Sequence, residues 1–352
     1  MILTKYKLGE ILDVTRGASL SGEYYATEGE YIRLTCGNFD YQNNCFKENK
    51  SKDNLYYVGD FKSEFLMEEG DIITPLTEQA IGLLGSTAII PESGKYIQSQ
   101  DVAKIICKED LLDKDFAFYL ISSALVKQQL SAAAQQTKIR HTSPDKIKDC
   151  TVWIPELSEQ KRIGKLLCSI DRKIELNRAI NQNLEAMAKQ LYDYWFVQFD
   201  FPNEEGKPYK SSGGEMVWNE KLKRKIPNEW DNCKLKDFIN LFDSKRIPLS
   251  SKDREERKGN YPYYGATGIM DYVNEYIFDG DYILLAEDGS TSDSKGFPIV
   301  QYIWGKNWVN NHAHIILPKN EQYLMFTYQM LRSIPAKQIE TGSIQKKISQ
   351  EN

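Results

Sequence analysis

The sequence predicts an α+β protein with two similar domains joined by one long helix of the coiled-coil type. Three observations predict it: short patterns recur in the same order in both halves, strand-like runs precede a helical pattern in each half, and an apolar heptad seam lies between the halves. We expect a first domain over residues 1–155, the central helix over 156–199, a linker over 200–229 and a second domain over 230–352.

The repeat is built from short matches, each weak alone. Their common order along the chain is hard to obtain by chance, so we infer a duplication. The matched segments are 6–11 with 233–238, 29–34 with 259–264, 69–73 with 279–283, 103–106 with 313–316, and 137–140 with 342–345.

Each copy contains short apolar runs bounded by Gly, Pro or Asp, which are typical of strands. A longer pattern with helical spacing follows them in both copies. The expected strands are 71–75, 86–90, 102–107, 281–286 and 312–317, and the expected helices are 115–130 and 321–334.

Between the copies, apolar residues follow an alternating four-three spacing for more than four heptads, which predicts a helix that pairs with another long helix. Over residues 158–195 it would be about 57 Å long, with Ser158 as its N-cap. Two asparagines in the seam would cost stability but fix register. A long surface helix packed on one domain is the alternative. The seam consists of Ile163, Leu167, Ile170, Ile174, Asn177, Asn181, Leu184, Leu191 and Trp195.

Composition narrows the class of protein. Of 352 residues, 41% are hydrophobic and 27% charged, and no run approaches the roughly 18 apolar residues of a membrane helix. The N-terminus lacks the apolar core of a secretory signal, so we expect a cytoplasmic protein without membrane contact. Six cysteines without a Cys-x-x-Cys pair favour neither a zinc ribbon nor a disulfide framework. The net charge of −5 excludes a uniformly basic surface and leaves local basic loops.

Catalytic and metal-binding patterns are weak. The run Asn260-Tyr261-Pro262-Tyr263 resembles the catalytic Asn-Pro-Pro-Tyr turn of DNA methyltransferases without its first proline, and no glycine-rich cofactor loop accompanies it. No phosphate-binding Gly-x-x-x-x-Gly-Lys loop is present. His312 and His314 alternate as ligands on a strand would, yet no third ligand lies nearby, and a structural or DNA-facing pair is the favoured interpretation. We therefore predict no catalytic residue and no metal site.

Polar loops after the last helix of each copy, residues 135–142 and 341–347, combine cations with Thr, Ser or Gln. Lys and Arg bind phosphates, while Arg and Gln pair with base edges. The second copy adds 243–246 and the aromatic turn 261–268. Solvated loops with incidental charge are the alternative. The candidate DNA-binding residues are Arg16, Arg33, Lys138, Arg140, His141, Lys245, Arg246, Tyr263, Tyr264, Thr267, Ser343, Gln345, Lys346 and Lys347.

Motifs around the central helix carry a family resemblance over essentially the whole chain. With this order of domains, they make the sequence resemble the specificity subunit of type I restriction–modification systems. The motifs are Ile154-Pro155-Glu156-Leu157-Ser158-Glu159-Gln160, Leu191-Tyr192-Asp193-Tyr194-Trp195-Phe196, Phe201-Pro202, Gly206-Lys207-Pro208-Tyr209-Lys210-Ser211-Ser212-Gly213-Gly214-Glu215-Met216 and Ile226-Pro227-Asn228-Glu229-Trp230.

The resemblance implies that each copy is a target-recognition domain for one half of a split double-stranded DNA site. The chain would not be an enzyme and would hold no cofactor. Its helix would set the spacing and dock two methyltransferase subunits, which carry S-adenosylmethionine and the chemistry, and motor-nuclease subunits could join.

One departure concerns the second long helix that follows the second domain in this family. By the repeat, Asn352 corresponds to about residue 147, so the second domain is expected to be truncated before that helix. A second copy of the chain or a separate helix-bearing fragment would then pair with the central helix. The alternative functions are a stand-alone DNA methyltransferase or nuclease with an unrecognised site, and a duplicated scaffold that binds no DNA.

Overall fold

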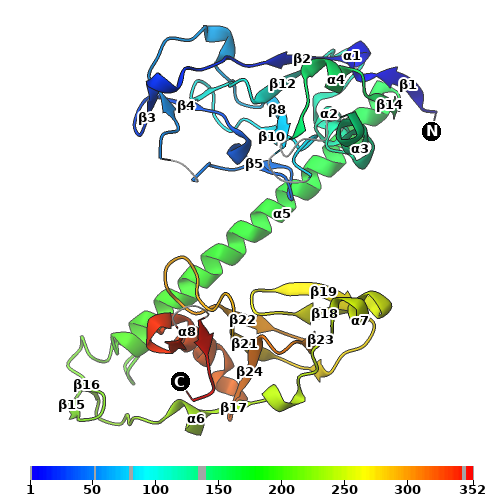
Figure 1. Cartoon of the computed structure of the whole chain (residues 1–352). Helices are drawn as coiled ribbons and strands as arrows, with labels where there is room; N and C mark the ends of the chain where they lie inside the picture. Colours follow the sequence, from blue (N-terminus) through cyan, green and yellow to red (C-terminus); the bar gives the residue numbers. More distant parts are fainter. Residues whose placement is uncertain (1, 51–52, 79–81, 134–139, 343–345, 352) are drawn as a thin grey trace. The chain divides into compact units, whose positions relative to one another are not determined.

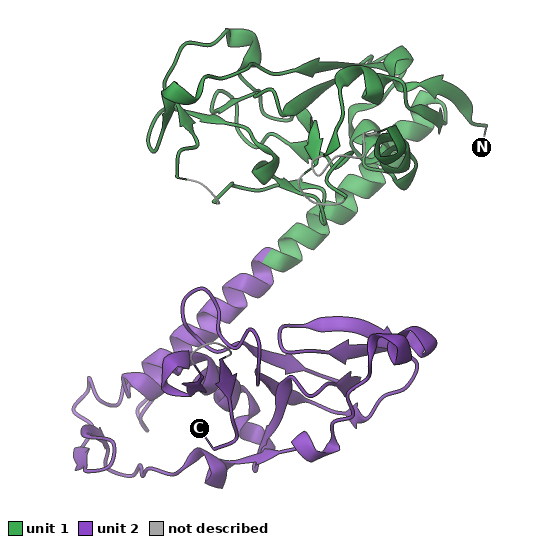
Figure 2. Cartoon of the chain, viewed as in Figure 1, with its two compact units in different colours: residues 1–178 green, residues 179–352 purple. Residues whose placement is uncertain are grey.

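A computed structural model describes residues 2–50, 53–78, 82–133, 140–342 and 346–351. The chain forms two compact units, residues 1–178 and 179–352 (Figure 2). The boundary falls inside the long helix, so each unit includes part of it. The division into four segments expected from the sequence remains a prediction.

The first unit is built on two four-stranded sheets (Figure 1). One has the antiparallel order β10-β8-β12-β2, and the other has the order β11-β4-β7-β3 with β11 parallel to β4. The strands of these sheets are β2 (Leu12–Arg16), β3 (Tyr25–Ala26), β4 (Tyr31–Arg33), β7 (Tyr56–Tyr57), β8 (Ile72–Pro75), β10 (Ala88–Ile89), β11 (Tyr96–Ile97) and β12 (Val102–Cys107).

Shorter pairs and helices complete this unit. The paired strands are β1 (Thr4–Lys7) with β14 (Thr151–Ile154), β5 (Phe39–Asp40) with β6 (Cys45–Phe46), and β9 (Thr77–Glu78) with β13 (Arg140–His141). The helices are α1 (Leu8–Ile11), α2 (Lys114–Ile121), α3 (Ala124–Ala133) and α4 (Pro144–Lys148).

The second unit repeats this plan. Its first sheet has the antiparallel order β17-β24-β21-β22, and its second has the order β19-β18-β23-β20 with β18 parallel to β23. The strands are β15 (Met216–Asn219), β16 (Arg224–Pro227), β17 (Ile239–Leu241), β18 (Lys258–Tyr264), β19 (Ile269–Val273), β20 (Phe278–Asp279), β21 (Tyr282–Ala286), β22 (Val300–Ile303), β23 (Lys306–Val309), β24 (Ala313–Pro318), β25 (Glu340–Thr341) and β26 (Lys347–Ile348). The helices are α6 (Leu235–Phe238), α7 (Ser251–Glu256) and α8 (Leu324–Ser333).

One inner strand of the first sheet in each unit, β8 in the first unit and β21 in the second, is called the central strand here, and it is covered on both faces. In β8, Ile72 packs with the helices of the first unit, whereas Ile73 enters a separate core beside the second sheet. In β21, Ile283 and Leu284 divide in the same way. Successive side chains of a strand point to opposite faces, so an almost continuous apolar run is what such a strand requires.

Sheet register corrects the expected repeat by one residue. In the first unit Ile105 lies opposite Ile72, and in the second unit Ile316 lies opposite Ile283. The Leu76 N–H donates to the Asp101 carbonyl and the Glu287 N–H donates to the His312 carbonyl, which matches residue 76 with 287 and residue 101 with 312. The segments 69–73 and 103–106 therefore correspond to 280–284 and 314–317, and not to 279–283 and 313–316. A shift of one residue exchanges the two faces of a strand, and apolar runs buried on both faces do not reveal it.

The long helix is α5 (Leu157–Tyr192), which continues into a π-helical turn, Asp193–Val197. A long helix between two sheet-rich units in the chain confirms the fold class predicted from the sequence. Ser158 is not its N-cap, because the helix begins one residue earlier and the Ser158 hydroxyl donates to the Glu156 carboxylate at 2.8 Å. The helix expected over residues 115–130 is two helices, α2 and α3.

Both ends of α5 pack within their own units. In the first unit, buried Gln160 accepts from the Asp113 N–H at 3.0 Å, and a Cβ at Gly164 would lie 2.8 Å from the Phe116 nitrogen. In the second unit, the rings of Tyr192 and Phe196 lie 5.6 and 4.7 Å from that of Phe326 on α8. These contacts fix the N-terminal end of α5 against the first unit and its C-terminal end against the second unit.

Between these ends, α5 exposes a wide apolar face. Of the predicted seam, Ile163, Leu167 and Trp195 are half-buried, whereas Ile170, Ile174, Asn177, Asn181, Leu184 and Leu191 are exposed. The exposed face is wider than the seam because Leu166, Leu176, Ile180 and Met187 also belong to it.

The segment after α5 is ordered by aromatic stacking. Phe201 stacks on Tyr209 and on Trp230, with ring centroids 4.8 and 5.2 Å apart, and the β15–β16 hairpin lies between these two residues in the chain. Within the part of the chain that the structure describes, none of the helices is long and apolar enough to cross a membrane.

Candidate nucleic-acid interface

A short basic segment lies beside the end of the central strand in each unit. We call Arg140–His141 the first basic edge and Lys346–Lys347 the second. The Thr142 N–H donates to the Leu76 carbonyl at 2.9 Å, and the Ile348 N–H donates to the Glu287 carbonyl at 2.8 Å. The two edges therefore occupy equivalent positions, with Arg140 corresponding to Lys346 and not, as the sequence match implied, to Gln345.

The first basic edge is anchored to neighbouring side chains. The Arg140 Nη1 donates to the Ser131 hydroxyl at 3.0 Å and lies 3.5 Å from a carboxylate oxygen of buried Glu78. His141 is exposed, and its Nδ1 lies 3.3 Å from the Thr77 hydroxyl. Exposed Arg16 donates to the Gln100 carbonyl at 2.8 Å. The next residue, Asp101, accepts from the same Thr77 hydroxyl that lies beside His141.

The second basic edge divides its two lysines between different roles. The Lys346 ammonium lies 2.9 Å from the Glu340 carboxylate, which also accepts from the Thr291 hydroxyl at 2.6 Å. Burial would raise the pKa of Glu340, but the hydrogen bonds from Thr291, Lys346 and Ser292 outweigh it and lower that pKa. Lys347 is exposed and has no ion pair among the described residues, so its ammonium is available to a ligand.

Arg246 belongs to a buried charge cluster that also contains Asp243, Glu287 and His314. Its Nη1 lies 2.7 Å from the Glu287 carboxylate and donates to the Ala313 carbonyl at 2.8 Å. Its guanidinium is also 3.5 Å from Asp243. The Arg246 guanidinium, with 13% of its side chain exposed, is thus engaged by contacts within its own unit, and a role in DNA binding remains a prediction.

The same cluster brings three potential metal ligands together, since ligand atoms of Asp243, Glu287 and His314 lie within 4.8 Å of one another. Both imidazole nitrogens of His314 already have partners, Asp243 at 2.6 Å and the Ile348 carbonyl at 2.7 Å. Arg246 supplies the positive charge that a metal would bring. The cluster is a salt-bridge network with no free ligand set. The expected histidine pair is divided, because His312 is exposed and contacts Asp288 instead.

Two further candidates are buried. Arg33 is 7% exposed, its guanidinium lies 3.8 Å from the Tyr25 ring centroid, and it donates to the Asn54 carbonyl. Tyr263 is 1% exposed, and its hydroxyl accepts from the Leu249 N–H at 2.9 Å. Both side chains are thus buried among contacts within their own units, which sequence patterns alone do not reveal.

The remaining candidates vary in exposure. Lys245 is exposed with its ammonium 5.0 Å from the Phe242 ring, Thr267 is exposed, and Tyr264 is half-buried. Lys138, Ser343 and Gln345 lie outside the described residues. The surface candidates that the structure brings to equivalent places are thus those of the two basic edges.

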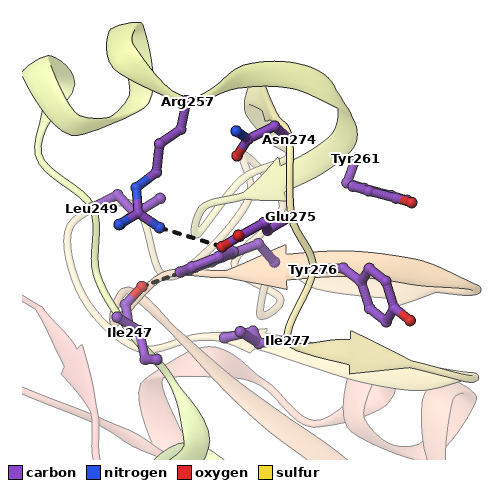
Figure 3. A pocket seen from close by; sticks show the side chains of 9 residues that line it. Ile247, Leu249, Arg257, Tyr261, Asn274, Glu275, Tyr276 and Ile277 are labelled. Carbon is purple, nitrogen blue, oxygen red and sulfur yellow. Dashed lines mark hydrogen bonds and ion pairs between the residues drawn. The ribbon is translucent and has the colours of Figure 1, made fainter.

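A pocket of about 540 Å³ lies near the start of β18 and was not expected from the sequence (Figure 3). The rings of Tyr261 and Tyr276 are 5.1 Å apart in its wall, and Arg257 lies 3.5 Å from Glu275. None of the lining side chains is a histidine, cysteine, serine or threonine. The two rings suit contact with an apolar or planar group, and the tyrosines among residues 261–276 are the feature of the sequence that points to this pocket.

Comparison with known proteins gives one consistent family. A family model of the type I restriction modification DNA specificity domain matches residues 3–186 and 227–352. A protein of Haemophilus influenzae assigned as a type I restriction enzyme specificity subunit is 38% identical over 115 residues, covering 33% of this chain and 28% of that protein. The MjaIX specificity subunit of Methanocaldococcus jannaschii is 24% identical over 150 residues, covering 43% and 32%. The matches thus span about a third or less of each relative.

A solved structure supports the fold. The crystal structure of the type I restriction–modification S subunit from M. genitalium aligns with a TM-score of 0.56 and 18% identity, covering 96% of this chain and 78% of that one. The two matched regions of the family model each contain one copy of the duplicated sheet architecture. The chain therefore belongs to the family of type I restriction–modification DNA specificity domains.

Proposed function

We propose that this chain is the DNA sequence-specificity subunit of a type I restriction–modification complex, with one half of a bipartite target read by each unit. The observation that carries the proposal is the pair of equivalent basic edges, each held by a backbone hydrogen bond at the end of a central strand. A net charge of −5 for the whole chain makes such local edges the places where phosphates would be neutralised.

The two edges are chemically suited to different contacts. The Arg140 guanidinium is half-exposed and held by Ser131, so it can present its outer N–H groups to a guanine edge. Lys347 offers an exposed point charge that suits a phosphate. Exposed Arg16 and Lys245 would add contacts to DNA phosphates.

The chemistry would belong to partners. Two methyltransferase subunits would dock on this chain and supply S-adenosylmethionine, and motor-nuclease subunits could join the complex in the cytoplasm. The chain itself would be a non-catalytic recognition subunit. A stand-alone methyltransferase or nuclease gains no support from the family match.

The first prediction tests this division of labour. The purified chain alone should transfer no methyl group from labelled S-adenosylmethionine to DNA, and addition of the methyltransferase subunit from the same operon should produce methylation at one bipartite sequence. Scintillation counting of the DNA measures transfer. Turnover by the chain alone, with contaminating partner excluded by mass spectrometry, would contradict the proposal.

The second prediction concerns the basic edges of the assembled complex. Lys347→Ala should weaken binding evenly across DNA sequences and lower the slope of log K against log salt by about one, because one phosphate contact is lost. Arg140→Ala should cost about 1–3 kcal/mol, and only on DNA with the intact first half-site, because a base contact is lost.

The matched control is Lys319→Ala. Lys319 is an exposed lysine of the second unit that follows the C-terminal end of β24, whereas the second basic edge lies near the N-terminal end of that strand. It should leave both affinity and salt slope unchanged in fluorescence-anisotropy titrations. If Arg140→Ala, Lys347→Ala and Lys319→Ala all behave alike, the basic edges are ordinary solvated surface.

The exposed face of α5 fits the expected pairing with a long helix. Full burial of each large apolar side chain would contribute about 1.5–3 kcal/mol at most, and Ile174, Ile180, Leu184 and Leu191 are each between 42% and 55% exposed. An apolar face of this length in water favours association. We propose that two copies pair through it when the chain is purified alone, and that a helix-bearing fragment or the methyltransferase covers it otherwise.

The third prediction tests this pairing. Ile174→Glu with Leu184→Glu should convert a dimer into a monomer in light scattering after gel filtration, because two charges would enter the apolar interface. Ala179→Glu with Gln182→Glu places the same two charges on the opposite side of α5 and should leave the dimer intact. A monomeric unmodified chain, or equal dissociation by both pairs, would rule out pairing through this face.

A further inference from the structure

The second basic edge is joined to the buried charge cluster by His314. The His314 Nε2 lies 2.7 Å from the carbonyl of Ile348, the residue after Lys347. Gln350 extends the attachment, because its side-chain amide donates to the Asp243 carboxylate at 2.6 Å. A side chain from β24 thus holds the strand that carries the basic edge.

The partners of His314 determine its protonation state. A carbonyl oxygen only accepts hydrogen bonds, so the Nε2 that faces Ile348 carries a hydrogen. The Nδ1 faces the Asp243 carboxylate at 2.6 Å, and Asp243 also accepts from the Ile315 N–H at 2.9 Å. Both partners are acceptors, which makes the doubly protonated imidazolium the form that satisfies all of these contacts.

The charges around His314 balance in that form. The groups facing it are the carboxylates of Asp243 and Glu287, the latter 3.8 Å from Nδ1, and the guanidinium of Arg246 beside them. Two negative and two positive groups make the cluster neutral. Loss of the proton would leave the carboxylate of Asp243, a residue only 9% exposed, without its compensating charge, which is costly.

The pKa values agree with this geometry. Burial alone would lower the pKa of His314, but hydrogen bonds to Asp243 and to the Ile348 carbonyl, with the charges of Asp243 and Glu287, outweigh it and raise the pKa above 6.5. Burial would raise the pKa of Asp243, but hydrogen bonds from His314, Ile315 and Gln350 lower it below 3.8.

The first basic edge has no such cluster. From the strand register, Ala103 stands where the second unit has His314, and Leu76 stands where it has Glu287. The first edge is therefore held by the backbone bond from Thr142, by the pairing of β13 with β9 and by the contacts of Arg140, and its one imidazole, that of His141, is exposed.

We propose that protonated His314 is a positioning residue for the second basic edge, so that reading of the second half-site weakens as pH rises and this pH dependence requires His314. The DNA part of this inference rests on the proposed function. The raised pKa of His314 stabilises the attachment below the unfolded value near 6.5, and this contribution is lost as pH rises through the folded pKa. In strong acid, below the lowered pKa of Asp243, protonation of this carboxylate removes the stabilising contribution again.

The fourth prediction is measured without DNA, by hydrogen exchange of the full chain between pH 6 and 9. The protection factor of the Ile348 amide, corrected for intrinsic exchange, should fall several-fold with rising pH. In His314→Gln, which keeps a neutral donor, it should be low and independent of pH. The control His312→Gln removes the neighbouring exposed imidazole and should retain the pH dependence of the unmodified chain.

A second variant keeps the inference testable if His314→Gln does not fold. Asp243→Asn removes the charge that favours the imidazolium, so the midpoint of the pH dependence should move to lower pH. An unchanged midpoint in Asp243→Asn, or a pH-independent protection factor in the unmodified chain, would overturn the inference.

DNA binding by the assembled complex then separates the two proposals. Replacement of one half-site at a time in the DNA measures the affinity that each half-site contributes. The contribution of the second half-site should fall several-fold between pH 6 and 9, and His314→Gln should abolish that pH dependence. If exchange at Ile348 changes with pH while binding to DNA does not, His314 positions the strand but the second basic edge does not read DNA. A pH dependence at the second half-site that persists in His314→Gln would contradict a role for His314 there.

Discussion

A single backbone hydrogen bond, repeated in both units, positions the surfaces on which the functional account depends. It joins the segment after the last helix to the residue that follows the central strand: Thr142 to Leu76 in the first unit and Ile348 to Glu287 in the second. The central strands are covered by apolar cores on both faces, so their ends are fixed in space. A short basic segment tied there inherits that rigidity, which a DNA-reading surface needs if its contacts are to discriminate between bases.

The same bond is supported differently in the two units. Around the first edge, Arg140 contacts Glu78 and Ser131 near the surface. Around the second, Lys346 contacts Glu340 a few residues earlier in the chain, and His314 joins the strand to the buried carboxylate of Asp243, which is distant in the sequence. Duplication has thus conserved the backbone arrangement while the side chains have diverged, as expected if each unit reads a different sequence with a common scaffold.

Periodicity predicted the large elements of the fold, because α5 and β12 carry strong and local patterns. It failed at the register of the repeat, since an apolar strand buried on both faces looks the same after a shift of one residue, and Ala103 was matched to its wrong counterpart. It also failed to separate buried from exposed polar residues. Arg33 and Arg246 have the same sequence signature as a freely exposed arginine. Only their tertiary partners, a tyrosine ring for one and two carboxylates for the other, show that their guanidinium groups are engaged within the units. The wide apolar face of α5 was foreseen as a seam, but not its full width.

The central claim is that each unit reads its own half of one DNA target. The most direct measurement is to exchange residues 230–352 for the corresponding domain of a relative with a different target, and to sequence the methylated sites made by the assembled complex. The account predicts that one half-site changes to that of the relative while the other half-site stays the same. A change in both half-sites together, or in neither, would contradict the assignment of one unit to each half.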